Sequence, residues 1–458
     1  MQHRYDAIVI GAGQAGPALA ARLAKADLKT ALIEAGELGG TCVNNGCTPT
    51  KTLVASARAA HVVRHAAEYG VIAGEMRVDM RAVKARKDAV VQHSVKSLGE
   101  WMGGVPNLTL VRGRARFIAP DRLQVGDDEL QAARIFINVG GRPTRPDWPG
   151  IDEVAYLTNI SMMDLDVLPE HLIVIGGSYI GLEFAQMYRR FGSRVSVIEA
   201  APRLIAREDV EVCDEVRAIL ERESIAVHVG ADNLTLARDG AGARVGFDTP
   251  AGAQQLAGSH LLIAVGRHLN TDDLGLEAAG VALDERGHII VDDELRTNAP
   301  NIWALGDVNG RGAFTHTSYN DYEIVAANLL DDGSRRVSDR IGTYAMYIDP
   351  PLARIGMSEA EVRKDGRAAL VASLPMARVA RARERGETDG FMKVLVDAES
   401  KRILGASLLG IEADEVVQLL LLAMAADLPV DRIQKTMWIH PTVSELLPTL
   451  LDKLEPLA

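Results

Sequence analysis

The first residues of the chain alternate between short apolar runs and one helix-forming segment. Ala7–Ile10 and Thr30–Ile33 are apolar runs of strand length, and Pro17–Lys25 between them has the composition of a helix. A short apolar run bounded by turn residues is typical of a buried strand in a parallel sheet. We therefore predict a strand–helix–strand unit with parallel strands at the start of the chain.

The turn between the first strand and the helix reads Gly-Ala-Gly-Gln-Ala-Gly. In a dinucleotide-binding turn, Gly11 allows the tight bend, Gly13 lets the backbone approach a pyrophosphate, and Gly16 lets helix and strand pack closely. Glu34 ends the second strand, 23 residues after Gly11, where a carboxylate binds adenosine ribose hydroxyls. The segment therefore predicts a dinucleotide site.

The same pattern recurs in the middle of the chain. His171–Ile175 is an apolar strand, a glycine-rich turn follows, and a helix is expected from Leu182. The strand Val195–Ile198 ends at an acid, again 23 residues after the first glycine of the turn. Ser178 replaces the middle glycine, and its small side chain is either tolerated or repositions the pyrophosphate. The equivalent positions are Gly176, Ser178, Gly181 and Glu199.

Three later apolar runs end at glycine. Two of them lead to Gly140 and Gly266, and we expect these exits to be crossovers between domains. The third, residues 302–305, is followed by Gly-Asp, which places Asp307 at the C-terminal end of a buried strand. A carboxylate there suits the ribityl or phosphate region of a flavin, and a simple turn is the alternative.

After about residue 335 the pattern changes. Tyr344–Ile355, Phe391–Val396 and Ile403–Leu409 are predicted strands, and Glu412–Ala426 is a predicted helix. This order predicts an antiparallel α+β domain. The longest apolar run, Leu419–Ala426, is too short to span a bilayer, so we expect a buried helix there.

Two cysteines, Cys42 and Cys47, lie in the glycine-flanked segment Gly39–Lys51, just after the first dinucleotide turn. Thiols five positions apart can close a small disulfide ring, which adds little chain entropy and favours reversible chemistry. A helix starting after Gly46 would lower a thiol pKa. The arrangement predicts transfer of electrons from a bound redox cofactor to a dithiol. Because the first dinucleotide turn precedes the dithiol, we assign FAD to it and a nicotinamide to the second.

Composition narrows the class of protein. The net charge of −12 argues against a nucleic-acid or anionic-membrane partner. Only three cysteines in 458 residues do not form a secreted disulfide framework, and a strand begins almost at the first residue, so we expect a cytoplasmic protein without a signal peptide. The third cysteine, Cys213, lies in an amphipathic helix pattern and is expected to be structural.

The motifs together resemble the pyridine nucleotide–disulfide oxidoreductases, from Ile8 to Glu445 and in the family's order. The C-terminal match is His-Pro-Thr-Val-Ser-Glu, which begins at His440. The resemblance implies that Cys47 faces the flavin, Cys42 exchanges with substrate, and His440 is the base. It also implies that Glu445 orients that base.

The same resemblance implies an ion pair of Lys51 and Glu183 beside flavin N5 and a flavin-binding role for Asp307. It implies a homodimer in which His440 reaches the dithiol of the other subunit. We expect no resident metal. The residues assigned to the two cofactors are Gly11, Gly13, Gly16, Glu34, Gly40, Thr41, Lys51, Gly140, Asp307, Gly176, Ser178, Gly181, Glu199 and Gly266.

The fold class that follows is α/β, with two Rossmann-like dinucleotide-binding domains, for FAD and NAD(P), and a C-terminal α+β dimerisation domain. We expect residues 1–146 and 269–335 to form the FAD-binding domain in two parts. Residues 147–268 are expected to form the NAD(P)-binding domain, and residues 336–458 the interface domain.

The acceptor is the open question within the family. Mercuric reductases typically carry a cysteine pair near the C-terminus, whereas Leu447–Ala458 contains no cysteine, and no N-terminal Cys-x-x-Cys metal-binding domain is present. Asn45 and Thr48 are polar where the family usually has aliphatic residues. The aromatic segment Ala313–Tyr322 is closer to mercuric-reductase-like and reactive-chlorine-resistance flavoproteins than to lipoamide dehydrogenase. We expect a small disulfide or a metal ion as acceptor.

For the nicotinamide we favour NADH over NADPH. Glu199 would accept from a ribose 2′-hydroxyl and repel a 2′-phosphate, and Ile205 stands where a second arginine is expected. Arg203 and Arg207 lie nearby and offset this preference. Two alternatives remain: a dihydrolipoyl dehydrogenase that reduces NAD⁺, and a redox sensor or interaction flavoprotein that turns over slowly.

Overall fold

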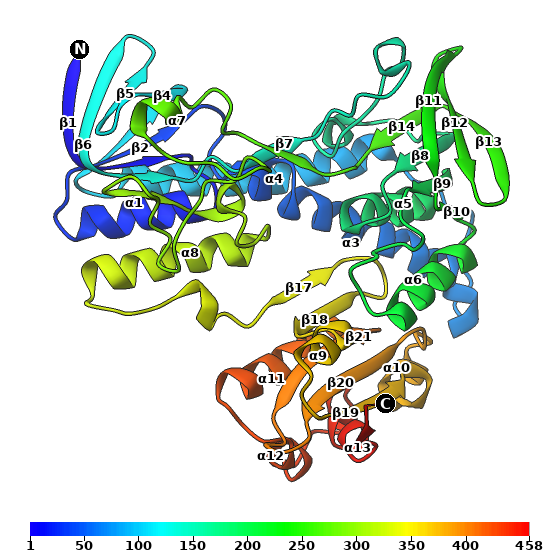
Figure 1. The fold of residues 1–458 in the computed structure, drawn as a ribbon. Helices are drawn as coiled ribbons and strands as arrows, with labels where there is room; N and C mark the ends of the chain where they lie inside the picture. Colours follow the sequence, from blue (N-terminus) through cyan, green and yellow to red (C-terminus); the bar gives the residue numbers. More distant parts are fainter. Residues whose placement is uncertain (458) are drawn as a thin grey trace.

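A mixed, largely parallel sheet forms the first domain of the computed structural model, which describes residues 1–457 (Figure 1). Its strand order is β3-β2-β1-β6-β5-β4, and β16 returns from far along the chain to pair with β6 in parallel. The strands are β1 (Gln2–Ile10), β2 (Thr30–Glu34), β3 (Leu108–Arg112), β4 (Ala115–Ala119), β5 (Arg122–Val125), β6 (Asp128–Ile137) and β16 (Ile302–Ala304).

Helices of the first domain carry the two cysteines and contact the second domain. Helices α1 and α8 pack together under the sheet, and α3 packs on α4 and on α5 of the second domain (Figure 1). The helices are α1 (Ala15–Lys25), α2 (Gly40–Asn44), α3 (Cys47–Arg64), α4 (Met80–Gly103), α7 (Leu276–Ala279) and α8 (Thr315–Leu330).

The second domain is built on a four-stranded parallel sheet of order β10-β9-β8-β14. Its strands are β8 (His171–Ile175), β9 (Arg194–Glu199), β10 (Ala226–Val229) and β14 (His260–Ile263), with α5 (Tyr179–Phe191) and α6 (Val210–Arg222). An antiparallel sheet adds β11 (Asp232–Asp239), β12 (Gly242–Thr249) and β13 (Gly252–Gly258). The chain enters and leaves this domain through a pair of antiparallel strands, β7 (Gly141–Pro143) and β15 (Arg267–Leu269).

The third domain, at the bottom of Figure 1, is a six-stranded antiparallel sheet of order β17-β18-β21-β20-β19-β22. Its strands are β17 (Thr343–Met346), β18 (Leu352–Gly356), β19 (Ala369–Pro375), β20 (Phe391–Asp397), β21 (Ile403–Leu409) and β22 (Glu455–Pro456). Its helices are α9 (Glu359–Asp365), α10 (Ala380–Glu384), α11 (Ala413–Ala425), α12 (Val430–Gln434) and α13 (Leu447–Leu451). The predicted α/β class with an α+β third domain is confirmed.

Two details of the third domain differ from the prediction. Tyr344–Ile355 is not one strand but the two antiparallel strands β17 and β18, because Pro350 and Pro351 in the loop between them lack the N–H that a strand ladder needs. The run Leu419–Ala426 is not wholly buried, since Leu422 is 66% exposed. A run of consecutive apolar residues covers every face of a helix, and the sheet covers only one.

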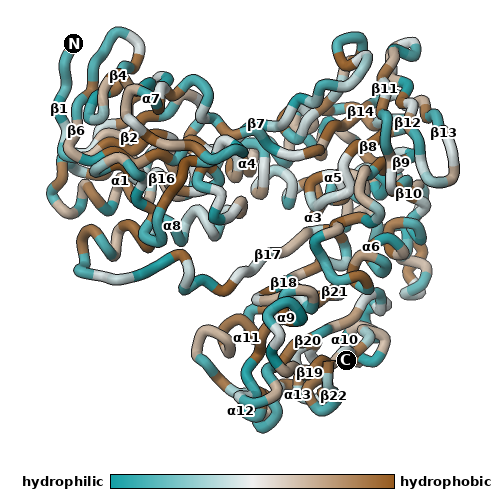
Figure 2. Tube along the Cα trace, in the orientation of Figure 1, coloured by the Kyte–Doolittle hydropathy of each residue, from teal (hydrophilic) through white to brown (hydrophobic). Residues whose placement is uncertain are grey.

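Buried apolar strands form the centre of each sheet, as Figure 2 shows by the hydrophobic colouring along them.

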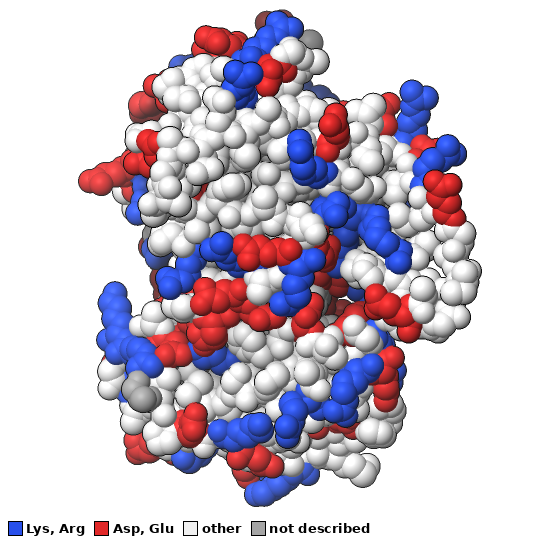
Figure 3. Space-filling view, turned by 90° about the vertical axis from the view of Figure 1, so that its right-hand side faces the viewer, with Lys and Arg blue, Asp and Glu red and all other residues white. Residues whose placement is uncertain are grey.

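Charged side chains join the second and third domains, and a band of mixed charge crosses the face drawn in Figure 3. The buried Lys393 of β20 contacts the carboxylates of Asp209 at 3.0 Å, Glu359 at 2.6 Å, and Glu211. No helix within residues 1–457 has the length and apolar composition needed to cross a membrane.

The buried imidazole of His171 predicts a loss of stability in acid. Its Nδ1–H donates to the Ala257 carbonyl at 2.8 Å, and its Nε2 accepts from the Ser196 hydroxyl at 2.9 Å. Burial lowers the pKa of His171 below that in the unfolded chain. The unfolded chain therefore binds this proton first, and the stability conferred by neutral His171 is lost as pH falls below about 6.5.

We expect the melting temperature of the protein to fall between about pH 8 and about pH 5.5. The fall should be smaller in His171→Gln, whose amide can donate and accept at the same two partners. Differential scanning calorimetry of both proteins in matched buffers measures this. Equal falls in the two proteins would show that His171 contributes nothing to the acid sensitivity.

Candidate active site

The two acids predicted to bind ribose hydroxyls occupy equivalent positions in the first and second domains. Glu34 accepts a hydrogen bond from the backbone N–H of Ala12, inside the first glycine-rich turn, at 2.6 Å. Glu199 accepts one from the N–H of Gly177, inside the second turn, at 2.5 Å. Each carboxylate is thus fixed beside the turn that precedes a helix N-terminus, which is the arrangement a dinucleotide needs.

Both turns require glycine for steric reasons. A Cβ on Gly16 would lie 2.0 Å from the carbonyl oxygen of Gly11, and one on Gly181 would lie 1.9 Å from that of Gly176. Ser178, the departure from the fingerprint, has φ −108°, which an ordinary residue adopts without strain. The second turn therefore keeps its shape with a serine in the middle position.

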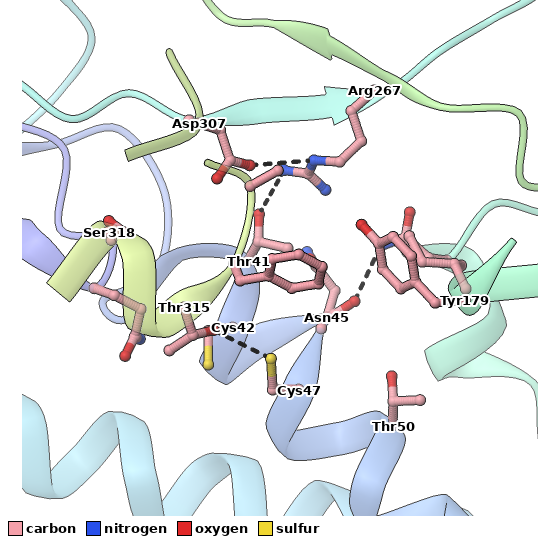
Figure 4. A pocket seen from close by; sticks show the side chains of 18 of the residues that line it. Thr41, Cys42, Asn45, Cys47, Thr50, Tyr179, Arg267, Asp307, Thr315 and Ser318 are labelled. Atoms are coloured by element: carbon pink, nitrogen blue, oxygen red, sulfur yellow. Dashed lines mark hydrogen bonds and ion pairs between the residues drawn. The ribbon is translucent and has the colours of Figure 1, made fainter. Parts of the chain in front are cut away.

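The two cysteines lie on two consecutive helices of the first domain. Cys42 is in α2, Cys47 is the first residue of α3, and both are free thiols. The hydroxyl of Thr315, the first residue of α8, lies 3.2 Å from the Cys47 sulfur (Figure 4). Thr315 is 268 positions away from Cys47, so sequence reasoning did not single it out.

The two sulfurs differ in protonation. A hydrogen bond from Cys42, another from Thr315 and the charge of Lys51 lower the pKa of Cys47 to about 6. The hydrogen bond to Cys47 and burial raise the pKa of Cys42 above its usual value. Cys47 is therefore the thiolate near neutral pH, and Cys42 keeps the shared proton. That Cys47 faces the flavin and Cys42 exchanges with substrate stays a prediction.

The predicted pair of Lys51 and Glu183 is in contact across a domain boundary. The ammonium of Lys51, on α3, lies 2.8 and 3.0 Å from the two carboxylate oxygens of Glu183, on α5. Only 3% of the Glu183 side chain and 32% of the Lys51 side chain are exposed. The pair lies at the wall of the same cavity as the dithiol.

That cavity has a volume of about 360 Å³ and opens where the first and second domains meet (Figure 4). Arg267, which the sequence analysis did not predict as a site residue, lines the upper side of the cavity in Figure 4. Arg267 forms an ion pair with Asp307 at 3.4 Å and lies 3.3 Å from the hydroxyl of Thr41. The predicted site residues that line the cavity are Gly13, Thr41, Cys42, Cys47, Lys51, Gly140, Glu183 and Asp307.

These residues fit FAD. The first glycine-rich turn and Glu34 suit the adenosine and pyrophosphate, Asp307 suits the ribityl region, and the cavity leads on to the dithiol. The second turn with Glu199 suits a second dinucleotide. The remaining predicted positions near these turns, Gly40 and Gly266, do not line the cavity.

His440 and Glu445 are paired but do not line the cavity of their own chain. The His440 Nδ1 lies 2.8 and 3.0 Å from the Glu445 carboxylate oxygens. A carboxylate only accepts, so Nδ1 carries the proton and Nε2 is left as the basic nitrogen. The His440 side chain is 72% exposed, so this nitrogen is accessible from outside the chain.

Comparison with known proteins identifies the family. The profile described as "Pyridine nucleotide-disulphide oxidoreductase" matches residues 5–321, and the dimerisation-domain profile of the same family matches residues 343–451. The chain is a pyridine nucleotide-disulphide oxidoreductase. The family predicted from the sequence is thereby confirmed, and so is the prediction that the protein is an enzyme.

Relatives cover the oxidoreductase almost end to end. It is 37% identical to the probable pyridine nucleotide-disulfide oxidoreductase RclA of Escherichia coli, covering 98% of this chain and 99% of the relative. It is 35% identical to a mercuric reductase of Streptomyces lividans, over 97% and 94% of the two chains. It is 31% identical to a dihydrolipoyl dehydrogenase of Chlamydia muridarum, over 97% and 96%.

Solved structures agree. The HOCl-induced flavoprotein disulfide reductase RclA of Escherichia coli superposes with a TM-score of 0.89 at 37% identity, covering 98% of this chain and 99% of that chain. Its Cu(II) complex gives a TM-score of 0.88 at 36% identity, over 97% and 99%. The oxidoreductase is a flavoprotein disulfide reductase that resembles RclA and mercuric reductase, and its family uses FAD and a pyridine nucleotide.

The contact between Thr315 and Cys47 generates a prediction. Loss of a hydrogen bond to a charged group costs about 1.5 kcal/mol, so Thr315→Val should raise the midpoint of the Cys47 titration by about one pH unit. Thr315→Ser keeps the hydroxyl and serves as the control. The measurement is the pH dependence of the absorption band between the thiolate and oxidised flavin. An unchanged midpoint in Thr315→Val would mean that the hydroxyl does not stabilise the thiolate.

Proposed function

We propose that the protein passes electrons from NADH, through bound FAD, to Cys42 and Cys47 and on to a small disulfide or metal ion. The observation that carries this proposal is the placement of two free thiols at the cavity wall, with Cys47 in contact with the Thr315 hydroxyl and next to the Lys51–Glu183 pair. When bound, FAD supplies the redox chemistry that connects a hydride donor to a dithiol.

The thiols complete the reaction by exchange. The Cys42 sulfur, once deprotonated by His440, attacks one sulfur of a disulfide acceptor, and the leaving thiolate takes a proton from the imidazole. The Cys47 thiolate then attacks the Cys42 sulfur and releases the second sulfur of the acceptor as a thiolate, which takes its proton from water. The acceptor gains two electrons and two protons, and the cysteine pair becomes a disulfide. Glu445 keeps the His440 ring in the tautomer that this exchange requires.

The exposed His440 supports a site shared between two subunits. His440 does not line the cavity of its own chain, and the domain that carries it matches the family's dimerisation domain. We propose a homodimer in which His440 of one subunit serves the dithiol of the other.

The preference for NADH rests on the second dinucleotide turn. Glu199 presents a carboxylate where a 2′-phosphate would lie, and Ile205 is buried. Arg203 lies 3.6 Å from Asp214, which partly neutralises it.

We also propose the domain division given above, with boundaries at 146, 268 and 335. The return of β16 to the first sheet supports the two-part FAD domain.

Among acceptors, the metal ion has specific support. A solved structure of RclA is a Cu(II) complex, and other relatives are mercuric reductases. Two cupric ions would each take one electron from the reduced pair. Dihydrolipoyl dehydrogenase is the second candidate, because relatives with that name cover nearly the whole chain.

The relay itself is tested by anaerobic reduction with NADH. We expect a long-wavelength absorption band from the Cys47 thiolate and flavin, because the thiolate forms near neutral pH. Cys42→Ser should show the band before any NADH is added, because its Cys47 cannot form the disulfide, and Cys47→Ser should show no band at any stage. In the wild-type protein, NADPH should produce the band more slowly than NADH. Flavin bleaching with no band in the wild-type protein would mean that the dithiol is not coupled to the flavin, and the relay would be wrong.

The shared site is tested with a heterodimer of Cys42→Ser and His440→Gln chains, isolated through two different affinity tags. If His440 acts across the interface, one of the two sites contains both native groups, and about half of wild-type disulfide or Cu(II) reductase activity returns. Each parent homodimer should be nearly inactive. If His440 acts within its own chain, both sites of the heterodimer are damaged and no activity returns.

A further inference from the structure

The loop between β17 and β18 brings a tyrosine of the third domain to the Lys51–Glu183 pair. The backbone N–H of Tyr347 donates to Glu183 Oε1 at 2.9 Å. The Tyr347 ring faces the ammonium of Lys51, with 4.7 Å between the nitrogen and the ring centroid. Tyr347 also lines the cavity that contains the dithiol. Three segments from three domains therefore meet at this one pair.

The contacts satisfy the needs of a buried ion pair. Attraction between two charges compensates for their lost hydration only where further hydrogen bonds satisfy the remaining atoms. Glu183 receives such a bond from Tyr347, in addition to the two from Lys51. The aromatic face covers the ammonium on a side where water would otherwise bind it. Burial raises the pKa of Tyr347, so its hydroxyl stays protonated and the ring neutral.

The loop is held in place from both other domains. Asp349 accepts hydrogen bonds from Arg58 of α3 at 2.7 Å, and it is also paired with Arg190 of α5. Gln186 of α5 binds the Asp349 backbone in both directions, at 2.7 and 2.8 Å. Tyr347 lies two residues before this anchor, so the backbone that carries its ring is held to α3 and α5.

The position of the Lys51 ammonium has a consequence for the dithiol. The charge of Lys51 lowers the pKa of Cys47, whereas that of Glu183 raises it. The titratable groups that act on Cys47 are these two and Cys42, and Tyr179 and Tyr347 also lie within range of its charge. The distance from the Lys51 ammonium to the Cys47 sulfur therefore affects how readily the Cys47 thiolate forms.

We propose that Tyr347 is a positioning residue of the redox centre: its backbone fixes Glu183, and its ring holds the Lys51 ammonium in place beside Cys47. The interface domain thereby reaches the electron-transfer site of its own chain, in addition to the role we propose for its His440 across the interface. This inference rests on the proposed dithiol relay, and nothing in the sequence motifs marks Tyr347.

The test follows the thiolate–flavin band of the reduced holoprotein as a function of pH. Without the ring, Lys51 becomes mobile and hydrated, and the midpoint should rise by about 0.5 pH unit in Tyr347→Leu, from the weaker Coulomb interaction. Tyr347→Phe keeps the ring and should restore the wild-type midpoint. FAD content and melting temperature are measured on every variant, and Tyr347→Met is the second apolar variant if Tyr347→Leu loses FAD.

A double-mutant cycle shows whether the effect passes through Lys51. In a Lys51→Met background, Tyr347→Leu should cause no further shift of the midpoint. A midpoint in Tyr347→Leu equal to that of the wild type would overturn the inference, as would an equal shift with and without Lys51. Absence of the band in the wild-type protein is a different result, because it contradicts the relay itself.

Discussion

Charges buried where three domains meet are the constraint on which the active site depends. Arg190, with 6% of its side chain exposed, is paired with Asp349 and Glu223, and Asp349 is paired with Arg58 as well. Burial opposes ionisation of Asp349, but the two guanidiniums outweigh it and hold its pKa below the usual range. Removing one member of a buried pair typically costs about 3–5 kcal/mol, because the other charge is left unpaired. These pairs therefore hold α3, α5 and the β17–β18 loop in one arrangement.

The chemistry of the dithiol follows from that arrangement. Helix α3 carries Cys47, then Lys51 one turn later and Arg58 two turns after Lys51, so the anchor at Arg58 also determines where the thiolate and the ammonium lie. The first residue of an 18-residue helix is a favourable position for an anionic sulfur. Thr315 completes the environment from α8, with its hydroxyl 3.2 Å from the Cys47 sulfur. The protonation of the two cysteines differs because their surroundings differ, although their residue type is the same.

Much of this fold could be predicted from local patterns. The two strand–turn–helix–strand units have fixed spacings, and their glycines and acids take the predicted places because the contacts involved lie within some 20 residues. The strand pattern failed at the β17–β18 loop, where a buried Ile348 continues the apolar run, and at Leu422, where exposure depends on which helix face meets the sheet. Thr315, Arg267 and Tyr347 were missed as site residues. Each meets its partner from another part of the chain, and no local signal marks such a contact.

The sequence by itself determined the chemistry that this chain can carry: two dinucleotide turns, a closely spaced pair of cysteines, and a histidine with a carboxylate five positions later. These are short-range features, and steric and hydrogen-bonding rules act on them directly. Only the tertiary structure decided which cysteine is the thiolate, which residues surround the Lys51–Glu183 pair, and that His440 is not at the cavity of its own chain. Those outcomes depend on burial and on charges within a few ångströms, and such proximity is created only when separate segments pack together.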